Sequence, residues 1–285
     1  MTAVAPTREL PVSDVQASLR LQLLRPGDPD LDDVYAFERL TFERSYGVAP
    51  AEHDAEFGPY HARSLFVSVA EVDGRVVGMM RLIMPGADPE AEPIKTFVEA
   101  ALAPWHLDVA RAIRLCGIDV RHTWDVATLS VDRTIGTRRA TVLGALYHAL
   151  VNLAAGNDVR YLTMTVDERV RSTLRMVGLP TTALPGARPA PFEGSAASTP
   201  AWGNCADMLS QQRQHNPEAH RLIRLGVGLT DVEMPDSASY RLAEPVVRHP
   251  ISVGSGAGRP RTRFGAATVT HLPVRGTRTP PAAIR

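Results

Sequence analysis

The segment 64–83 reads SLFVSVAEVDGRVVGMMRLI, and it decides the fold class. Ser64–Val72 and Arg75–Ile83 are apolar runs rich in β-branched and aromatic residues, and Asp73-Gly74 stands between them. An Asp-Gly pair between two such runs is a strong signal for a β-hairpin. The chain is therefore expected to contain an antiparallel pair of strands.

A strand–helix–strand unit follows the hairpin. Trp124–Val131 alternates like a strand, residues 138–155 carry leucine and valine at helical spacing, and Arg160–Val166 is a second strand. The alternation places two sets of side chains on opposite faces of the first strand: Trp124, Val126 and Thr128 against Asp125, Ala127 and Leu129. A helix between two strands makes them a parallel pair, so we predict an α/β fold with a mixed sheet flanked by helices.

The remaining pattern adds elements on both sides of this core. Before the hairpin we expect a strand over 19–25 and a helix over 30–44 capped by Asp30 or Asp32. A short helix over 94–102 follows the hairpin. After the second strand of the unit we expect a helix over 168–177 capped by Asp167, extended stretches over 179–204, and helices over 205–225 with a break at Asn216-Pro217. Residues 45–63 are interpreted as a polar loop, and residues 104–121 show no clear pattern.

Composition divides the chain into four parts. We predict a flexible N-terminus over 1–18, one α/β domain over 19–210, a helical extension over 211–249, and a disordered tail over 250–285 that is rich in Arg, Pro and Gly. Seven arginines and no acidic residue follow Glu244, so the tail is basic and the rest of the chain is acidic. The tail is either a solvated segment or a contact for an acidic partner.

The composition favours a cytoplasmic globular protein. The 285 residues carry no formal net charge, and no apolar run is long enough to span a membrane or to act as a signal peptide. The two cysteines, Cys116 and Cys205, predict neither a disulfide framework nor a zinc site. Lys95 is the only lysine, which we interpret as a consequence of genome composition.

Three stretches carry motifs of a known family. Val76–Ile83 contains a G-x-x-R-L pattern, Thr96-Phe97 follows it, and Trp124–Asp132 reads WDVATLSVD. In this order the motifs resemble those of the acyl-homoserine-lactone synthases and N-acyl amino acid synthases, which are GNAT-type N-acyltransferases. The resemblance covers about residues 20–210 and implies a GNAT-like mixed sheet.

The resemblance implies transfer of an acyl group from a thioester to the amine of a small metabolite, with an amino acid as one candidate. The donor is acyl-CoA or an acyl carrier protein, acting as a co-substrate. No permanently bound cofactor, no metal and no nucleic-acid partner is expected.

Such a reaction needs a base for the amine, a backbone N–H for the thioester oxygen, and a site for the phosphate of the donor. The resemblance assigns three groups of residues: Asp125 and Thr128 to catalysis; Leu129, Ser130, Val131, Arg133, Arg138 and Arg139 to the donor; and Arg39, Phe42, Arg81, Phe97 and Trp124 to the substrates. The acidic stretch around Asp54 and Glu56 is expected to be ordered by Arg81.

The sequence departs from the family pattern at three places. Asp125 is one methylene shorter than the family's glutamate, and Thr128 replaces an arginine, so homoserine lactone is not the expected product. The phosphate loop 133–138 lacks its last glycine, which favours a carrier protein, whose arm has one phosphate, over coenzyme A.

Two other classes of function stay open. A degenerate acyltransferase fold would bind an acyl-thioester or a partner without turnover. Alternatively, the basic tail would carry the main role, in binding to nucleic acid or to a membrane surface. Deletion of residues 250–285 separates the last hypothesis, because an acyltransferase keeps its activity and a tail-driven binder loses its partner.

Overall fold

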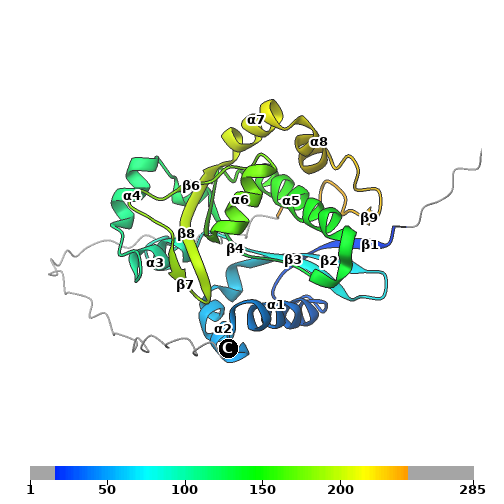
Figure 1. Cartoon of the computed structure of the whole chain (residues 1–285), viewed down its shortest axis with the longest axis horizontal. Helices are drawn as coiled ribbons and strands as arrows, with labels where there is room; N and C mark the ends of the chain where they lie inside the picture. The colour runs from blue at the N-terminus through cyan, green and yellow to red at the C-terminus, as the bar shows by residue number, and fades with distance from the viewer. Residues whose placement is uncertain (1–16, 243–285) are drawn as a thin grey trace, which may run out of the picture. The chain divides into compact units, whose positions relative to one another are not determined.

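Within residues 17–242, which are those that the computed structural model describes, nine strands form one mixed sheet (Figure 1). The strands are β1 (Leu19–Leu24), β2 (Ser64–Glu71), β3 (Val76–Ile83), β4 (Thr123–Val131), β5 (Tyr161–Asp167), β6 (Thr182–Ala183), β7 (Ala190–Phe192), β8 (Ser195–Asn204) and β9 (Val232–Glu233). Their order is β6-β8-β5-β4-β3-β2-β1-β9, and β7 pairs with β8 beside this path. Most of the predicted N-terminal segment and the whole predicted tail lie outside the described residues.

Helices cover both faces of the sheet. They are α1 (Leu31–Tyr46), α2 (Pro50–Phe57), α3 (Lys95–Ala101), α4 (Val109–Cys116), α5 (Arg139–Gly156), α6 (Glu168–Met176), α7 (Cys205–His215) and α8 (Pro217–Leu225). Figure 1 shows α1 and α2 on one face and α5 on the opposite face. None of the helices in the described part of the chain has both the length and the apolar composition needed to cross a bilayer.

The predicted hairpin and the strand–helix–strand unit are confirmed. β2 and β3 pair antiparallel, and Gly74 in the turn has a positive φ of 91°, which glycine adopts without strain. β4 and β5 run parallel and are joined through α5, as the predicted mixed α/β sheet requires. The predicted cap of α6 is also present, since the Asp167 side chain accepts a hydrogen bond from the Arg169 amide.

Residues 45–63 are helical, so their prediction as a loop is wrong. Pro50 occupies the first turn of α2, where its missing N–H costs nothing, and the Glu52 side chain accepts from the Ala49 amide at 3.2 Å. A 3-10 turn, η1 (Gly58–Arg63), continues the segment. Only His53 and Phe57 are buried on α2, too few apolar positions to give a helical pattern.

Two smaller differences concern helix starts. The Asp108 carboxylate accepts from the Arg111 amide at 2.9 Å and begins α4, which the sequence pattern did not predict. Asp30 precedes α1 but does not cap it with its side chain. Its carboxylate accepts a hydrogen bond from the Gln22 side chain instead.

A β-bulge in β4 changes which side chains share a face. Arg81 pairs with Thr128 and Leu82 pairs with Val126, so Ala127 is an extra residue on β4. The alternation reverses at this point, and Asp125 and Thr128 lie on the same face. The prediction that they face opposite sides is therefore wrong.

The main hydrophobic core lies between the sheet and α5. β3 approaches α5 closely at Gly78, where an added Cβ would overlap Cγ1 of Val142. Val142 is fully buried, and its branched side chain has little rotamer freedom in a helix. The glycine therefore sets the spacing between the sheet and its covering helix.

We expect Gly78→Ala to lower the free energy of unfolding by about 1–3 kcal/mol, because the methyl group overpacks this contact. The matched control is Gly58→Ala, where an added Cβ meets nothing within 4 Å and φ is −52°. Urea unfolding of both variants measures the difference. Equal stability of the two variants would contradict the close-packing argument.

Candidate active site

The parallel pairing of β4 with β5 covers only three residue pairs and ends at Asp125 and Thr163. Beyond that point both strands continue, but they no longer pair with each other. A cavity of about 330 Å³ lies there, lined by all residues of β4 from Asp125 to Val131 and by residues 164–167 of β5. Backbone amides of β4 that point to this gap have no β5 partner.

The cavity has a polar side and an apolar arm. The polar side is formed by residues of α1, α3, the sheet and the β7–β8 turn: Thr41, Ser45, Lys95, Glu99, Asp125, Thr128, Ser130, Thr165 and Glu193. The apolar arm enters the core under α5, α6 and α7: Tyr147, Leu150, Leu162, Met164, Val166, Val170, Leu174, Leu179 and Met208. The gap between the strands connects the two.

Asp125 is a buried carboxyl group at this junction, with 1% of the residue exposed. One of its oxygens accepts a hydrogen bond from the Thr96 amide at 2.7 Å. Burial, with a further contribution from the nearby Glu99 carboxylate, raises the pKa of Asp125 to about 7. A carboxyl group with this pKa can take up a proton near neutral pH.

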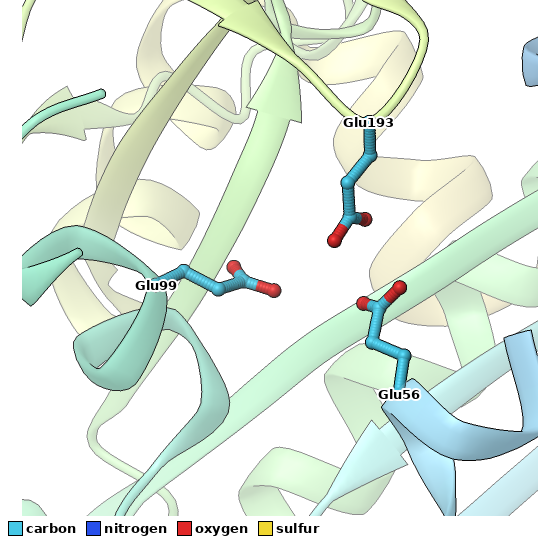
Figure 2. A group of neighbouring side chains, drawn as sticks. All are labelled: Glu56, Glu99 and Glu193. Carbon is cyan, nitrogen blue, oxygen red and sulfur yellow. The ribbon is translucent and has the colours of Figure 1, made fainter. Parts of the chain in front are cut away.

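Three glutamates from separate elements point toward one another (Figure 2), and one of them, Glu99, is near enough to Asp125 to raise its pKa. We call Glu56 of α2, Glu99 of α3 and Glu193 of the β7–β8 turn the glutamate triad. An oxygen from each lies within 4.8 Å of the others. The ammonium group of Lys95 bonds to Glu56 and Glu99 and lies 4.7 Å from the centre of the Phe57 ring.

The charges of this cluster shift one another's pKa values. Burial lowers the pKa of the Lys95 ammonium, but the carboxylates of Glu99 and Glu56 raise it more, so its net shift is upward. Partial burial of its carboxyl group, and the negative charge of Glu56, raise the pKa of Glu193. Glu193 is exposed as a residue at the hairpin tip, but its carboxylate faces those of Glu56 and Glu99.

A tight turn fixes the position of Glu193. Glu193 and Gly194 have φ values of 45° and 77°, as the two central residues of a type I′ turn require. An added Cβ on Gly194 would overlap the carbonyl of Tyr46 at the end of α1. The hairpin tip therefore packs directly on α1 and holds Glu193 at the cavity.

A second buried network lies beneath the polar side. The Arg81 guanidinium, 1% exposed, pairs with Glu38 of α1 and packs against the rings of Phe57 and Phe66. The Thr128 hydroxyl donates to the other Glu38 oxygen at 2.7 Å. Arg81 thus orders Glu38, and not Asp54 or Glu56 as the sequence suggested.

The predicted donor residues divide into two groups. Leu129, Ser130 and Val131 line the cavity, and so do Arg133, in the 3-10 turn before α5, and Arg139, the first residue of α5. Arg138 does not line it: its guanidinium pairs with Glu71 of β2. This ion pair gives Arg138 a structural reason to stand at a helix start.

Only one of the predicted substrate residues, Phe42, lines the cavity. Arg39 pairs with Asp54 at 2.7 Å near the surface. Phe97 packs in a small cluster with α3 and α4, and Trp124 lies on the opposite face of β4 from Asp125, in the main core. Arg81 is enclosed in the network with Glu38.

Sequence reasoning missed Lys95, Glu99 and Glu193, and it placed Glu56 in an acidic stretch ordered by Arg81. Lys95 and Glu99 are four residues apart on a predicted helix, so their pairing was detectable. That pairing, together with the fact that Lys95 is the only lysine in an arginine-rich chain, was the available signal. Glu56 and Glu193 reach the same place from distant segments, which no local pattern indicates.

No protein-family model matches this sequence, and a comparison with curated proteins gives no match. Among solved structures, the chain is similar to a CoA-dependent acyl-homoserine lactone synthase, BjaI, with SAM and isopentyl-CoA (14% identity, 79% of this chain, 99% of the other, TM-score 0.46). It is also similar to FeeM, an N-acyl amino acid synthase from uncultured soil microbes (16% identity, 70% of this chain, 96% of the other, TM-score 0.46). A GCN5-related N-acetyltransferase from Kribbella flavida matches as well (15% identity, 65% of this chain, 97% of the other, TM-score 0.40).

The likeness that the sequence motifs predicted is thus found among solved structures, and it is remote. With TM-scores below 0.5 the likeness carries no conclusion about this chain, so its function has to be inferred from its own residues.

We expect Asp125 to make stability depend on pH. Folded Asp125 keeps its proton up to about pH 7, whereas the unfolded chain loses it near pH 4, so the folded state binds more protons between these values. The free energy of unfolding therefore falls as pH rises through this window, by about 4 kcal/mol at most. Asp125→Asn cannot titrate, and its amide oxygen can still accept from Thr96, so this fall is absent.

Urea unfolding of the wild type and of Asp125→Asn at pH 4.5, 6 and 8 measures the effect. The variant gains stability relative to the wild type as pH rises. Parallel pH profiles for the two proteins would show that Asp125 does not titrate abnormally.

Proposed function

We propose that this chain is an N-acyltransferase that moves an acyl group from a thioester donor to the amine of a small molecule. The observation that carries the proposal is the gap between β4 and β5, which joins a polar side containing Asp125 to an apolar arm. A thioester placed in the gap would have its acyl chain on one side and the acceptor on the other.

The donor arm would bind along β4. A pantetheine arm carries amide groups, and an extended amide chain pairs well with a strand edge that lacks a partner. β4 offers such an edge from Val126 to Val131. An amide of the same edge would donate to the thioester oxygen as it becomes negative in the transition state.

The apolar arm would hold the acyl chain. It is lined by buried side chains of three helices and β5, so methylene groups placed there leave water. Each buried methylene contributes roughly 0.8 kcal/mol to binding. The arm therefore favours an acyl chain longer than acetyl.

The phosphate of the donor would lie near the start of α5. Arg133 and Arg139 line the cavity there, and no side chain caps the first turn of the helix. Two arginines can bind a coenzyme A diphosphate or the single phosphate of a carrier protein. The incomplete loop 133–138 supports the carrier protein as the donor.

The proposed reaction uses these groups. The acceptor amine enters from the polar side, Asp125 takes a proton from it, and the nitrogen attacks the thioester carbon. The N–C bond forms, the C–S bond breaks, and the thiolate leaves and takes up a proton. An amino acid as the acceptor stays a prediction from the sequence.

We expect Asp125→Asn to lower turnover by about 10²–10⁴-fold, because general-base catalysis contributes this much. In the wild type, kcat/KM should rise with pH and level off above about pH 7, where Asp125 is ionised. Thiol release from an acyl-thioester in the presence of amine measures both. Asp207→Asn, an exposed change on α7, is the matched control. A threefold loss or less in Asp125→Asn would remove Asp125 from the mechanism.

We expect Val170→Phe to shorten the accepted acyl chain, because the larger side chain fills part of the apolar arm. The ratio of kcat/KM for dodecanoyl over butanoyl donors should fall at least tenfold. Val227→Phe, at an exposed position outside the cavity, is the control and should keep the ratio. An unchanged ratio in Val170→Phe would place the acyl chain elsewhere.

Binding without turnover is the second candidate. Thr128 replaces the family's arginine, and its hydroxyl proton is committed to Glu38. If a thioester binds and protects the fold but stays intact with every amine offered, the chain is a binding module.

A further inference from the structure

Lys95 is a buried charged residue that has no part in the proposed reaction. It is 6% exposed, and its ammonium group bonds to Glu56 of α2 and to Glu99 of α3. The same group lies 4.7 Å from the centre of the Phe57 ring, at the end of α2. A lysine is buried in this way only where its charge is paired. Lys95 therefore ties α3 to α2 through an ion pair and a ring contact.

The first turn of α3 depends on this tie. The helix has seven residues, and no side chain caps its start. So short a helix has little stability of its own and is held by its tertiary contacts. Lys95 is its first residue and Thr96 its second. The bond from Lys95 to α2 thus fixes the position of the Thr96 amide.

The Thr96 amide in turn fixes the carboxyl group of Asp125. It donates to Oδ2 of Asp125 at 2.7 Å, and the Thr163 hydroxyl donates to the same oxygen at 3.5 Å. Within residues 17–242, Oδ1 has no hydrogen-bond partner, and Asp125 lines the cavity. Oδ1 is therefore the oxygen left for an acceptor amine.

The two charges of α3 act on Asp125 in opposite directions. Burial contributes most to the raised pKa of Asp125, and the Glu99 carboxylate raises it further. The Thr96 hydrogen bond and the Lys95 ammonium group lower it. Glu99 is itself held on both oxygens, by Lys95 and by the Thr165 hydroxyl.

Titratable groups of other elements also face this part of the site. Among the described residues they are Glu56 of α2, Tyr60 of η1 and Glu193 of the β7–β8 turn. Against the effect of burial, Glu99, Glu56 and Glu193 raise the pKa of Lys95, so it stays charged. Burial raises the pKa of the Tyr60 hydroxyl, which stays neutral near pH 7.

We infer that Lys95 is a positioning residue for Asp125: it fixes the first turn of α3 on α2, so that the Thr96 amide holds Oδ2 and Oδ1 stays directed to the acceptor amine. This inference rests on the proposed acyl transfer and adds a residue to it. Lys95 transfers no proton and acts through Asp125.

The titration of Asp125 tests the inference without a substrate. We expect Lys95→Met to raise the pKa of Asp125, because the ammonium group is lost and the Thr96 hydrogen bond loosens. Glu99→Gln should lower it, because the new amide still accepts from Thr165 but carries no charge. Each shift should be roughly 0.5 pH units or more. Carbon-13 NMR of the Asp125 carboxyl group in the full-length protein, assigned by its absence in Asp125→Asn, measures both.

Activity supplies the second readout. In Lys95→Met we expect kcat with one acyl-thioester and one amine to fall roughly tenfold or more, because Asp125 is misplaced, while the KM of the donor changes little. Lys95→Arg keeps the charge and should restore most of the turnover and the titration. Arg221→Met removes an exposed, paired charge on α8 and is the control that should change neither.

The outcomes separate this inference from the proposed function. An unchanged titration of Asp125 in folded Lys95→Met, or shifts of the same sign in Lys95→Met and Glu99→Gln, would overturn the role of Lys95. If Lys95→Met does not fold, Lys95→Gln takes its place, since its amide can still donate to Glu56 and the upward shift is expected there too. Shifts of the expected signs without acyl transfer by any variant or by the wild type would support the positioning of Asp125 and remove the proposed function.

Discussion

The site depends on the early end of the pairing between β4 and β5. Three residue pairs hold the parallel strands together, and beyond Asp125 and Thr163 they leave a gap in the middle of the sheet. An interior gap leaves backbone amides without strand partners, each at a cost of about 1–3 kcal/mol if it stays buried and unpaired. A ligand with its own amide groups would offset that cost, which supports the proposed placement of an extended thioester arm in the gap.

The bulge at Ala127 links this gap to the chemistry. By reversing the alternation of β4, it places Asp125 and Thr128 on the face covered by α1 and α3, while Leu129 and Val131 turn toward the core under α5. The buried pair of Arg81 and Glu38 then ties α1 to β3 on the polar face. Loss of one partner of such a pair leaves a buried charge and costs about 3–5 kcal/mol. The polar side of the cavity therefore rests on a buried ion pair that joins α1 to β3.

The sequence predicted the parts of the fold that depend on local pattern. The Asp73-Gly74 hairpin and the helix between β4 and β5 followed from turn chemistry and periodicity. α2 was missed because only His53 and Phe57 of its residues are buried. The bulge was missed because strict alternation was assumed, which also put Asp125 and Thr128 on opposite faces. Glu193 joins the site through a turn packed on α1, a long-range contact that no sequence spacing reveals.

In the proposed function an acyl-thioester occupies the gap along β4. Hydrogen–deuterium exchange with a non-hydrolysable acyl-thioether of coenzyme A, and with the corresponding acyl-pantetheine thioether, tests it most directly. We expect slower exchange on binding in peptides covering 126–131 and 164–167, with little change in β1 and β2, whose amides are already paired. If saturating ligand leaves the exchange of 126–131 unchanged, or protects only a surface away from this gap, the thioester does not bind along β4.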